Sequence, residues 1–142
     1  MTQDFLARPS PVHPAAAFLV GSCVPLFLGG LLSDWAYSST AEIQWTNFAS
    51  WLIAGALVFA GFALLWAAID TIRAPRGNRT STIIYALLLA VTFLLGFINA
   101  LIHAKDAWAK MPTALWLSVI VTLMAAVAAW LAFSGWQRGA RP

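Results

Sequence analysis

Charged residues are scarce in this chain. Asp, Glu, Lys and Arg make up 9% of its 142 residues, whereas hydrophobic residues make up 61%. A soluble domain draws about 25% of its residues from those four types, because water must solvate its surface. The composition therefore excludes the soluble, secreted, fibrous and disordered classes and predicts a protein embedded in a lipid bilayer.

Cysteine and catalytic motifs are also nearly absent. Cys23 is the only cysteine, which excludes an intramolecular disulfide and a zinc site built from thiolates. Because Cys23 lies inside an apolar run, we expect a buried, inert thiol. The sequence contains no G-x-S-x-G, no H-E-x-x-H and no Gly-rich phosphate loop, so it gives no positive indication of an enzyme.

Four apolar runs are present, and each is close to the roughly 20 residues that cross a hydrocarbon core about 30 Å thick. They are continuous rather than alternating, which favours helices over barrel strands. Their short connections predict one all-α domain, an integral membrane four-helix bundle with up-down-up-down topology. We expect the first run to be retained, because it is longer than the apolar core of a signal peptide. The spans cover about Ala15 to Trp35, Phe48 to Ile69, Ile83 to Ile102 and Ala114 to Phe133.

Basic residues predict the orientation of this bundle. Six of the eight lie beside the chain ends and the second connection, while two lie at the opposite side. By the positive-inside rule, both termini face the cytoplasm. The net charge of +3 is explained by this topology, so we expect no nucleic-acid partner. The six are Arg8, Arg73, Arg76, Arg79, Arg138 and Arg141, and the two opposite are Lys105 and Lys110.

Small and polar residues recur at helical spacing and predict the faces that pack together. In lipid, helices associate through close approach at small side chains and through interhelical hydrogen bonds. Polar residues in the third span share one face, which should point into the bundle. The predicted packing stripes are Ala56, Ala60, Ala63 and Ala67 in span two, Tyr85, Thr92, Gly96, Asn99 and His103 in span three, and Ser118, Thr122, Ala125, Ala129 and Ala132 in span four.

Titratable and polar residues form two groups at opposite ends of the spans. Such groups are expensive near lipid, so they usually pair or mark a site. A carboxylate beside His103 would orient its ring, and Asp70 with Arg73 could form an i,i+3 ion pair. We expect an outer site of Asp34, Asn99, His103 and Asp106, with Gln44 and Asn47 nearby, and an inner cluster of His13, Asp70, Arg73 and Tyr85.

Two histidines are the obvious candidates for haem ligands. His13 and His103 fall at opposite ends of their spans, roughly the ~30 Å of the core apart. They therefore cannot share one haem within a single chain, and a second protomer or another ligand would be needed. The sequence leaves the identity of any bound metal open.

Several strings resemble the bacterial membrane family catalogued as Domain of Unknown Function 2231. They are VHP before span one, SDWAY followed by AEIQWTNFASWLIAGALVFAG, AAID before the arginine-rich connection, and FINALIHAKDAWAKMPTALWLSVI. The similarity runs from His13 to about Gly135. It implies a four-helix protein of the bacterial inner membrane, and it supports carrying over Asp34, Asn99, His103 and Asp106 as site residues.

The same resemblance implies a link to electron transfer. Members of the family look like neighbours or fusion partners of redox modules such as Rieske and cytochrome domains. This association holds at the level of the family. Relatives commonly carry a second histidine before span one and another opening span three. In this chain His13 is the only histidine of the lead-in to span one, and the residues that open span three, Ser81 to Tyr85, include no histidine. A histidine cluster at the inner face is therefore depleted.

Three functional hypotheses follow. The first is a structural or accessory membrane protein whose outer polar site holds a small molecule, a lipid or a partner helix, with a homo-oligomer also open. The alternative is a redox module that binds haem b or quinone and exchanges electrons with a cytochrome or Rieske partner. A third is proton or ion translocation through Asp34, Asp70 and His103.

Overall fold

Four long helices form the protein, as the sequence predicts. The computed structural model describes residues 12–105 and 107–136, and within those ranges it contains helices and no strand. Each long helix is long and apolar enough to cross a membrane, which confirms the all-α membrane bundle. The long helices are α1 (Pro14–Thr40), α2 (Ile43–Arg73), α3 (Arg79–His103) and α5 (Thr113–Ser134), and the short ones are η1 (Arg76–Asn78) and α4 (Ala107–Lys110).

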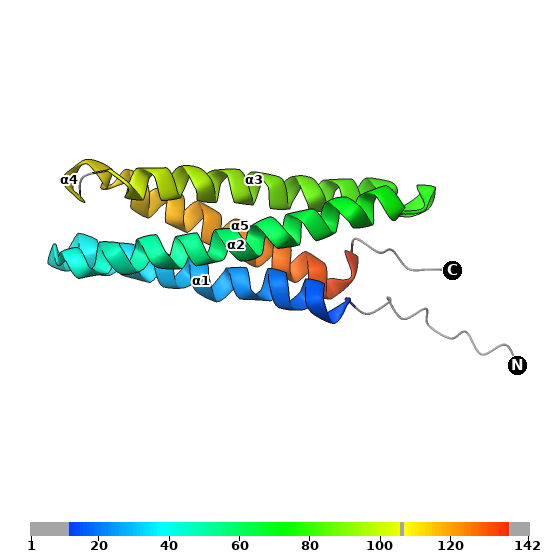
Figure 1. The fold of residues 1–142 in the computed structure, drawn as a ribbon, viewed down its shortest axis with the longest axis horizontal. Coiled ribbons are helices and arrows are strands. Elements are labelled where there is room, and N and C mark those ends of the chain that lie inside the picture. Colours follow the sequence, from blue (N-terminus) through cyan, green and yellow to red (C-terminus); the bar gives the residue numbers. More distant parts are fainter. Residues whose placement is uncertain (1–11, 106, 137–142) are drawn as a thin grey trace, which may run out of the picture.

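The long helices pack in a ring. α1 contacts α2 and α5, and α3 contacts the same two helices, so α1 and α3 lie across a diagonal. Figure 1 shows the helices running antiparallel in chain order, which confirms the up-down-up-down topology. One end of the bundle carries the start of α1, η1 and the end of α5, and we call it the Arg end. The opposite end carries the α1–α2 turn, His103 and α4, and we call it the His end.

The helices extend beyond the predicted spans, most of all between α1 and α2. The sequence predicts a connection over Ala36 to Thr46, but only Ala41 and Glu42 separate the two helices. Hydroxyl groups explain the difference, because Ser38, Ser39 and Thr40 donate hydrogen bonds to backbone carbonyls three or four residues earlier and so fit within a helix. The helix ends where Ala41 takes a left-handed conformation with φ 57°, a common way to stop a helix.

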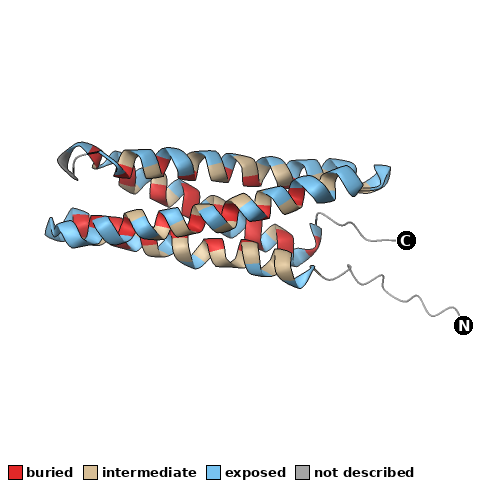
Figure 2. Ribbon diagram, in the orientation of Figure 1, coloured by how far each residue is buried: buried red, intermediate tan, exposed pale blue. Residues whose placement is uncertain are grey.

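Small residues predominate on the buried faces of α2 and α5, and many large apolar residues face outward. The predicted stripes are buried in α2, α3 and α5 (Figure 2), which confirms them as packing faces. A Cβ built on Gly96 would lie 3.1 Å from both Phe27 and Leu57, so α3 approaches its neighbours closely there. Outward-facing Trp51 is 79% exposed and Trp130 is 69% exposed, as expected of side chains that contact lipid.

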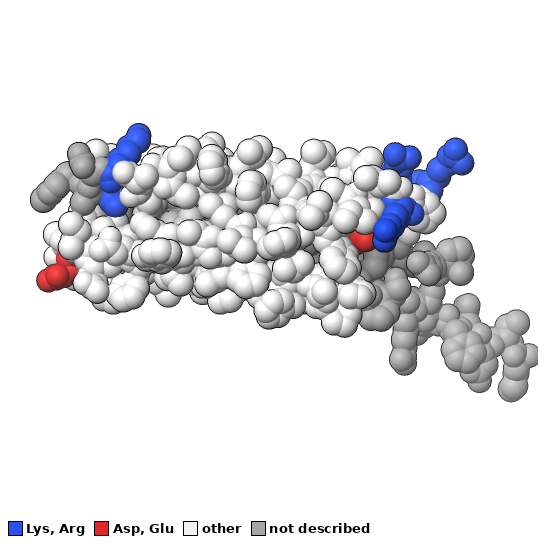
Figure 3. Space-filling view, in the orientation of Figure 1, with Lys and Arg blue, Asp and Glu red and all other residues white. Residues whose placement is uncertain are grey.

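In the part of the chain that the structure describes, charged side chains lie at the two ends of the bundle. Figure 3 shows basic side chains at both ends of the face that it draws and none on the flank between them. A flank without charge is compatible with contact with the hydrocarbon core, because a charged side chain at the centre of a span costs about 2.5–3.5 kcal/mol.

Candidate functional site

A buried polar network lies at the His end and joins three helices. α1 contributes Asp34, α3 contributes Asn99 and His103, and α5 contributes Ser118. Asn99 and His103 are one helical turn apart, so both project from the face of α3 that points into the bundle. The structure thus brings together three of the four predicted outer residues. The fourth, Asp106, lies outside the described residues.

Asp34 is the centre of this network. Its Oδ1 lies 2.7 Å from His103 Nε2, and its Oδ2 accepts a hydrogen bond of 2.5 Å from Ser118 Oγ. Asn99 Nδ2 donates in turn to Ser118 Oγ over 2.9 Å. Asp34 and Asn99 are completely buried, and Ser118 and His103 nearly so. Charge-assisted hydrogen bonds of this kind are stronger than neutral ones, and burial shields them from competing water.

The second ring nitrogen of His103 fixes where its proton lies. His103 Nδ1 is 2.9 Å from the backbone carbonyl oxygen of Asn99. A carbonyl oxygen can only accept, so Nδ1 carries a hydrogen. His103 Nε2 and Asp34 Oδ1 therefore share a hydrogen across 2.7 Å, and the hydrogen bond from Nδ1 to the Asn99 carbonyl orients the ring.

Lys110 extends the network to the remaining long helix. Its ammonium group donates to the hydroxyl of Thr46 at the start of α2 and approaches the carbonyl oxygen of His103 at 3.4 Å. Lys110 is only 3% exposed. Burial lowers its pKa, and the negative charge of Asp34 opposes part of that effect, because burial disfavours the charged form of an amine.

One atom of the network has no partner. Asn99 Oδ1 is buried and accepts no hydrogen bond within the described part of the chain. An unpaired buried acceptor costs roughly 1–3 kcal/mol, so this amide oxygen is a place where a water or another small donor would bind.

The sequence did not identify three members of this network. The sequence predicts a packing role for Ser118, a role in membrane orientation for Lys110, and a place for Thr46 in the connection between the first two spans. The sequence signal for Ser118 is its position on a face of small residues that must point into the bundle. By contrast, Gln44 and Asn47 do not join the site, because both are exposed.

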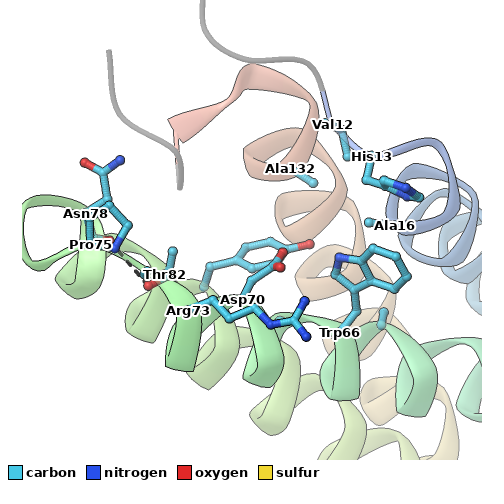
Figure 4. A pocket seen from close by; sticks show the side chains of 14 residues that line it. Val12, His13, Ala16, Trp66, Asp70, Arg73, Pro75, Asn78, Thr82 and Ala132 are labelled. Carbon is cyan, nitrogen blue, oxygen red and sulfur yellow. Dashed lines mark hydrogen bonds between the residues drawn. The ribbon is translucent and has the colours of Figure 1, made fainter. Parts of the chain in front are cut away.

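The predicted inner cluster lies at the Arg end around a cavity of about 250 Å³. His13, Asp70, Arg73 and Tyr85 all line it, as Figure 4 shows for the labelled residues. The ring of His13 lies 4.8 Å from that of Trp66, a lining residue that the sequence did not place here. Asp70 and Arg73 form no ion pair in the described part of the structure, so the expected i,i+3 pair is not formed.

The two sites are separate. His13 begins α1 and His103 ends α3, so they lie at opposite ends of the bundle. Two apolar clusters, which include Val20, Phe27 and Leu89, fill the space between them. Among the described residues, no three His, Cys, Asp or Glu side chains are grouped as metal ligands. Cys23 is buried, as expected.

Comparison with known proteins identifies one family. The family model described as "Predicted membrane protein (DUF2231)" matches residues 9–138. No curated protein and no solved structure matches the chain. The matched range includes every long helix, the buried network and the cavity.

Proposed function

Because the chain belongs to the DUF2231 family of predicted membrane proteins, we propose that it is a structural or accessory protein of the bacterial inner membrane. The His end works as a clamp that holds the four helices in one arrangement and so presents a fixed outer surface to a membrane partner. One observation carries this proposal: direct side-chain hydrogen bonds around Asp34 join α1, α3 and α5. Lys110 and Thr46 add α2.

The network favours a clamp over a ligand site, because its own groups satisfy one another. Asp34 and Ser118 form a hydrogen bond although 84 residues separate them in sequence, and both are buried. A ligand that bound here would have to displace these partners. Only a ligand that bound to Asn99 Oδ1, which has no partner in the described part of the chain, would not. Buried, hydrogen-bonded charges in membrane proteins point into the bundle and pair with one another, and they can fix one helix arrangement against others.

The charge distribution supports an orientation with the Arg end in the cytoplasm. Arg73, Arg76 and Arg79 lie at this end, and the described basic residues at the other end are Lys105 and Lys110. Connections rich in Arg and Lys remain on the cytoplasmic side. The proposed clamp then lies at the outer face.

Replacement of the clamp residues tests the proposal. We expect His103→Leu and Asn99→Leu to lower the thermal stability of the detergent-solubilised protein and to reduce recovery of any partner that copurifies from native membranes. Thr92→Val is the matched control, because Thr92 Oγ1 bonds only to the Leu88 carbonyl within α3. Unchanged stability and partner recovery in the two Leu variants would contradict the clamp.

The redox alternative has a separate test. Haem iron at His103 would have to replace either Asp34 or the Asn99 carbonyl, since both ring nitrogens are engaged. At His13, Nδ1 accepts from the backbone N–H of Ala15 over 3.2 Å, so Nε2 is the nitrogen available to a ligand. The purified protein would show a Soret band if it bound haem b and an extractable quinone if it bound quinone. Absence of both would remove the redox alternative.

A further inference from the structure

The cavity at the Arg end is built from the four long helices and η1. Val12, His13 and Ala16 come from the start of α1 and its lead-in, and Trp66 to Arg73 come from the last turns of α2. Asn78 from η1, Thr82 and Tyr85 from α3, and Ala132 from α5 also line it. Because these are the points where the apolar spans end, the cavity opens at the depth of lipid headgroups.

Two opposite charges line this cavity without neutralising each other. Asp70 and Arg73 both project from the end of α2 in Figure 4, and no ion pair joins them in the described structure. Both are exposed. A ligand with one negative and one positive group can therefore bind to both at once. A purely anionic ligand would be repelled by Asp70, and a purely cationic one by Arg73.

The rest of the lining is mixed: Trp66 and several alanines are apolar, whereas His13, Asn78, Thr82 and Tyr85 carry polar groups. Ala67 and Ala132 are buried in the core that borders the cavity, and Trp66 stacks beside His13. Since His13 Nδ1 accepts a hydrogen bond, its neutral ring carries the hydrogen on Nε2 and can donate it. Aromatic side chains with a polar edge are typical of the membrane interface.

We propose that this cavity binds the headgroup of a phospholipid with a primary amine, namely phosphoethanolamine. The guanidinium of Arg73 pairs with the phosphate, for which its planar set of donors is suited. The ammonium group pairs with Asp70. The volume of about 250 Å³ accommodates a headgroup rather than a whole lipid, and the acyl chains lie along the outer surface of the helices.

Lipid binding to the purified full-length chain in detergent tests this assignment. Native mass spectrometry would compare dioleoyl-phosphatidylethanolamine with the phosphatidylcholine and phosphatidylglycerol of the same chains. We expect about fivefold stronger binding of the ethanolamine lipid, the factor that roughly 1 kcal/mol at a partly exposed ion pair supplies. Choline has no N–H to donate to Asp70, and glycerol has no cation.

Three variants connect that preference with the cavity. Asp70→Asn should abolish the preference for ethanolamine over choline, while Arg73→Gln should weaken binding of all three phospholipids. Arg76→Gln is the matched control, because it removes the same charge from a neighbouring residue that does not line the cavity. Thermal unfolding of each variant would verify that these exposed substitutions preserve the fold.

Several results would overturn the assignment. Equal binding of the three lipids would remove the headgroup preference. A preference that survives in both Asp70→Asn and Arg73→Gln would place it elsewhere on the molecule. Binding of free phosphoethanolamine without the lipid would identify a soluble ligand, and recovery of a quinone in place of phospholipid would identify a neutral one.

Discussion

His103 Nε2 lies 2.7 Å from Asp34 Oδ1, although 69 residues separate the two in sequence. The contact crosses a diagonal of the bundle from α3 to α1, which are not neighbours in the helix ring. It therefore joins these two helices directly at the His end. Both side chains are almost completely buried, so neither can exchange its partner for water.

Loss of both partners should destabilise the bundle by less than the sum of the two single losses. We expect His103→Leu or Asp34→Leu alone to lower the free energy of unfolding by about 3 kcal/mol, since each leaves the other side chain buried without its partner. The double variant should recover about 1–3 kcal/mol of the summed loss, which is the coupling between the two groups. A double-mutant cycle by reversible unfolding in detergent would measure this coupling. Thr92→Val, which removes a hydroxyl that bonds within α3, is the control; additive effects of His103→Leu and Asp34→Leu would refute the pair.

Ser118 should contribute more than a packing serine. Its hydroxyl donates to Asp34 Oδ2 and accepts from Asn99, so Ser118→Ala leaves two buried groups without a partner and should cost about 2 kcal/mol. Thr122→Val provides the comparison, because the Thr122 hydroxyl bonds only to the Ser118 carbonyl within α5. Thermal unfolding of the two variants checks the difference, and equal melting temperatures would show that Ser118 acts only by its size.

Lys110 should make stability depend on pH in the alkaline range. Burial lowers its pKa in the folded protein below the value of 10.5 that it has when unfolded. Between those two pKa values the unfolded chain binds more protons, so the free energy of unfolding rises as the pH rises. Lys110→Met should flatten this rise, and Lys105→Met, at an exposed lysine of the same end, should not. Melting temperatures measured up to pH 10.5 would show no difference between Lys110→Met and the unsubstituted chain in this dependence if Lys110 were solvated.

Gly96 should be the position in α3 least tolerant of a methyl group. The added Cβ would lie 3.1 Å from Leu57 and from Phe27, and Phe27 is only 1% exposed, so its ring has no space to move. Gly96→Ala should therefore destabilise the bundle by about 1–3 kcal/mol, even though alanine favours helix. Gly77→Ala is the control, since nothing lies within 4 Å of the added atom. A more stable Gly96→Ala variant would mean that the helices separate there without cost.

The sequence was sufficient for the fold because lipid imposes strong rules. Continuous apolar runs had to be helices, and the stripe that includes Asn99 and His103 had to face inward. The partners across the bundle could not be predicted in the same way. Lys110 looked like an exposed charge, and its burial depends on how α4 folds back over Thr46. Likewise the cavity depends on how the start of α1 and the end of α2 are placed, which residue spacing does not specify.

Chemical labelling would establish which end faces the cytoplasm. Gly77 lies in η1 at the Arg end and Glu42 in the α1–α2 turn at the His end, and both are exposed. In intact spheroplasts, a maleimide that cannot cross the membrane should label Glu42→Cys and leave Gly77→Cys unlabelled until the cells are opened, because arginine-rich connections stay inside. The native Cys23 is 2% exposed, so the unsubstituted chain gives the background signal. Labelling of Gly77→Cys before lysis would invert the orientation and place the Asp34–His103 clamp on the cytoplasmic side.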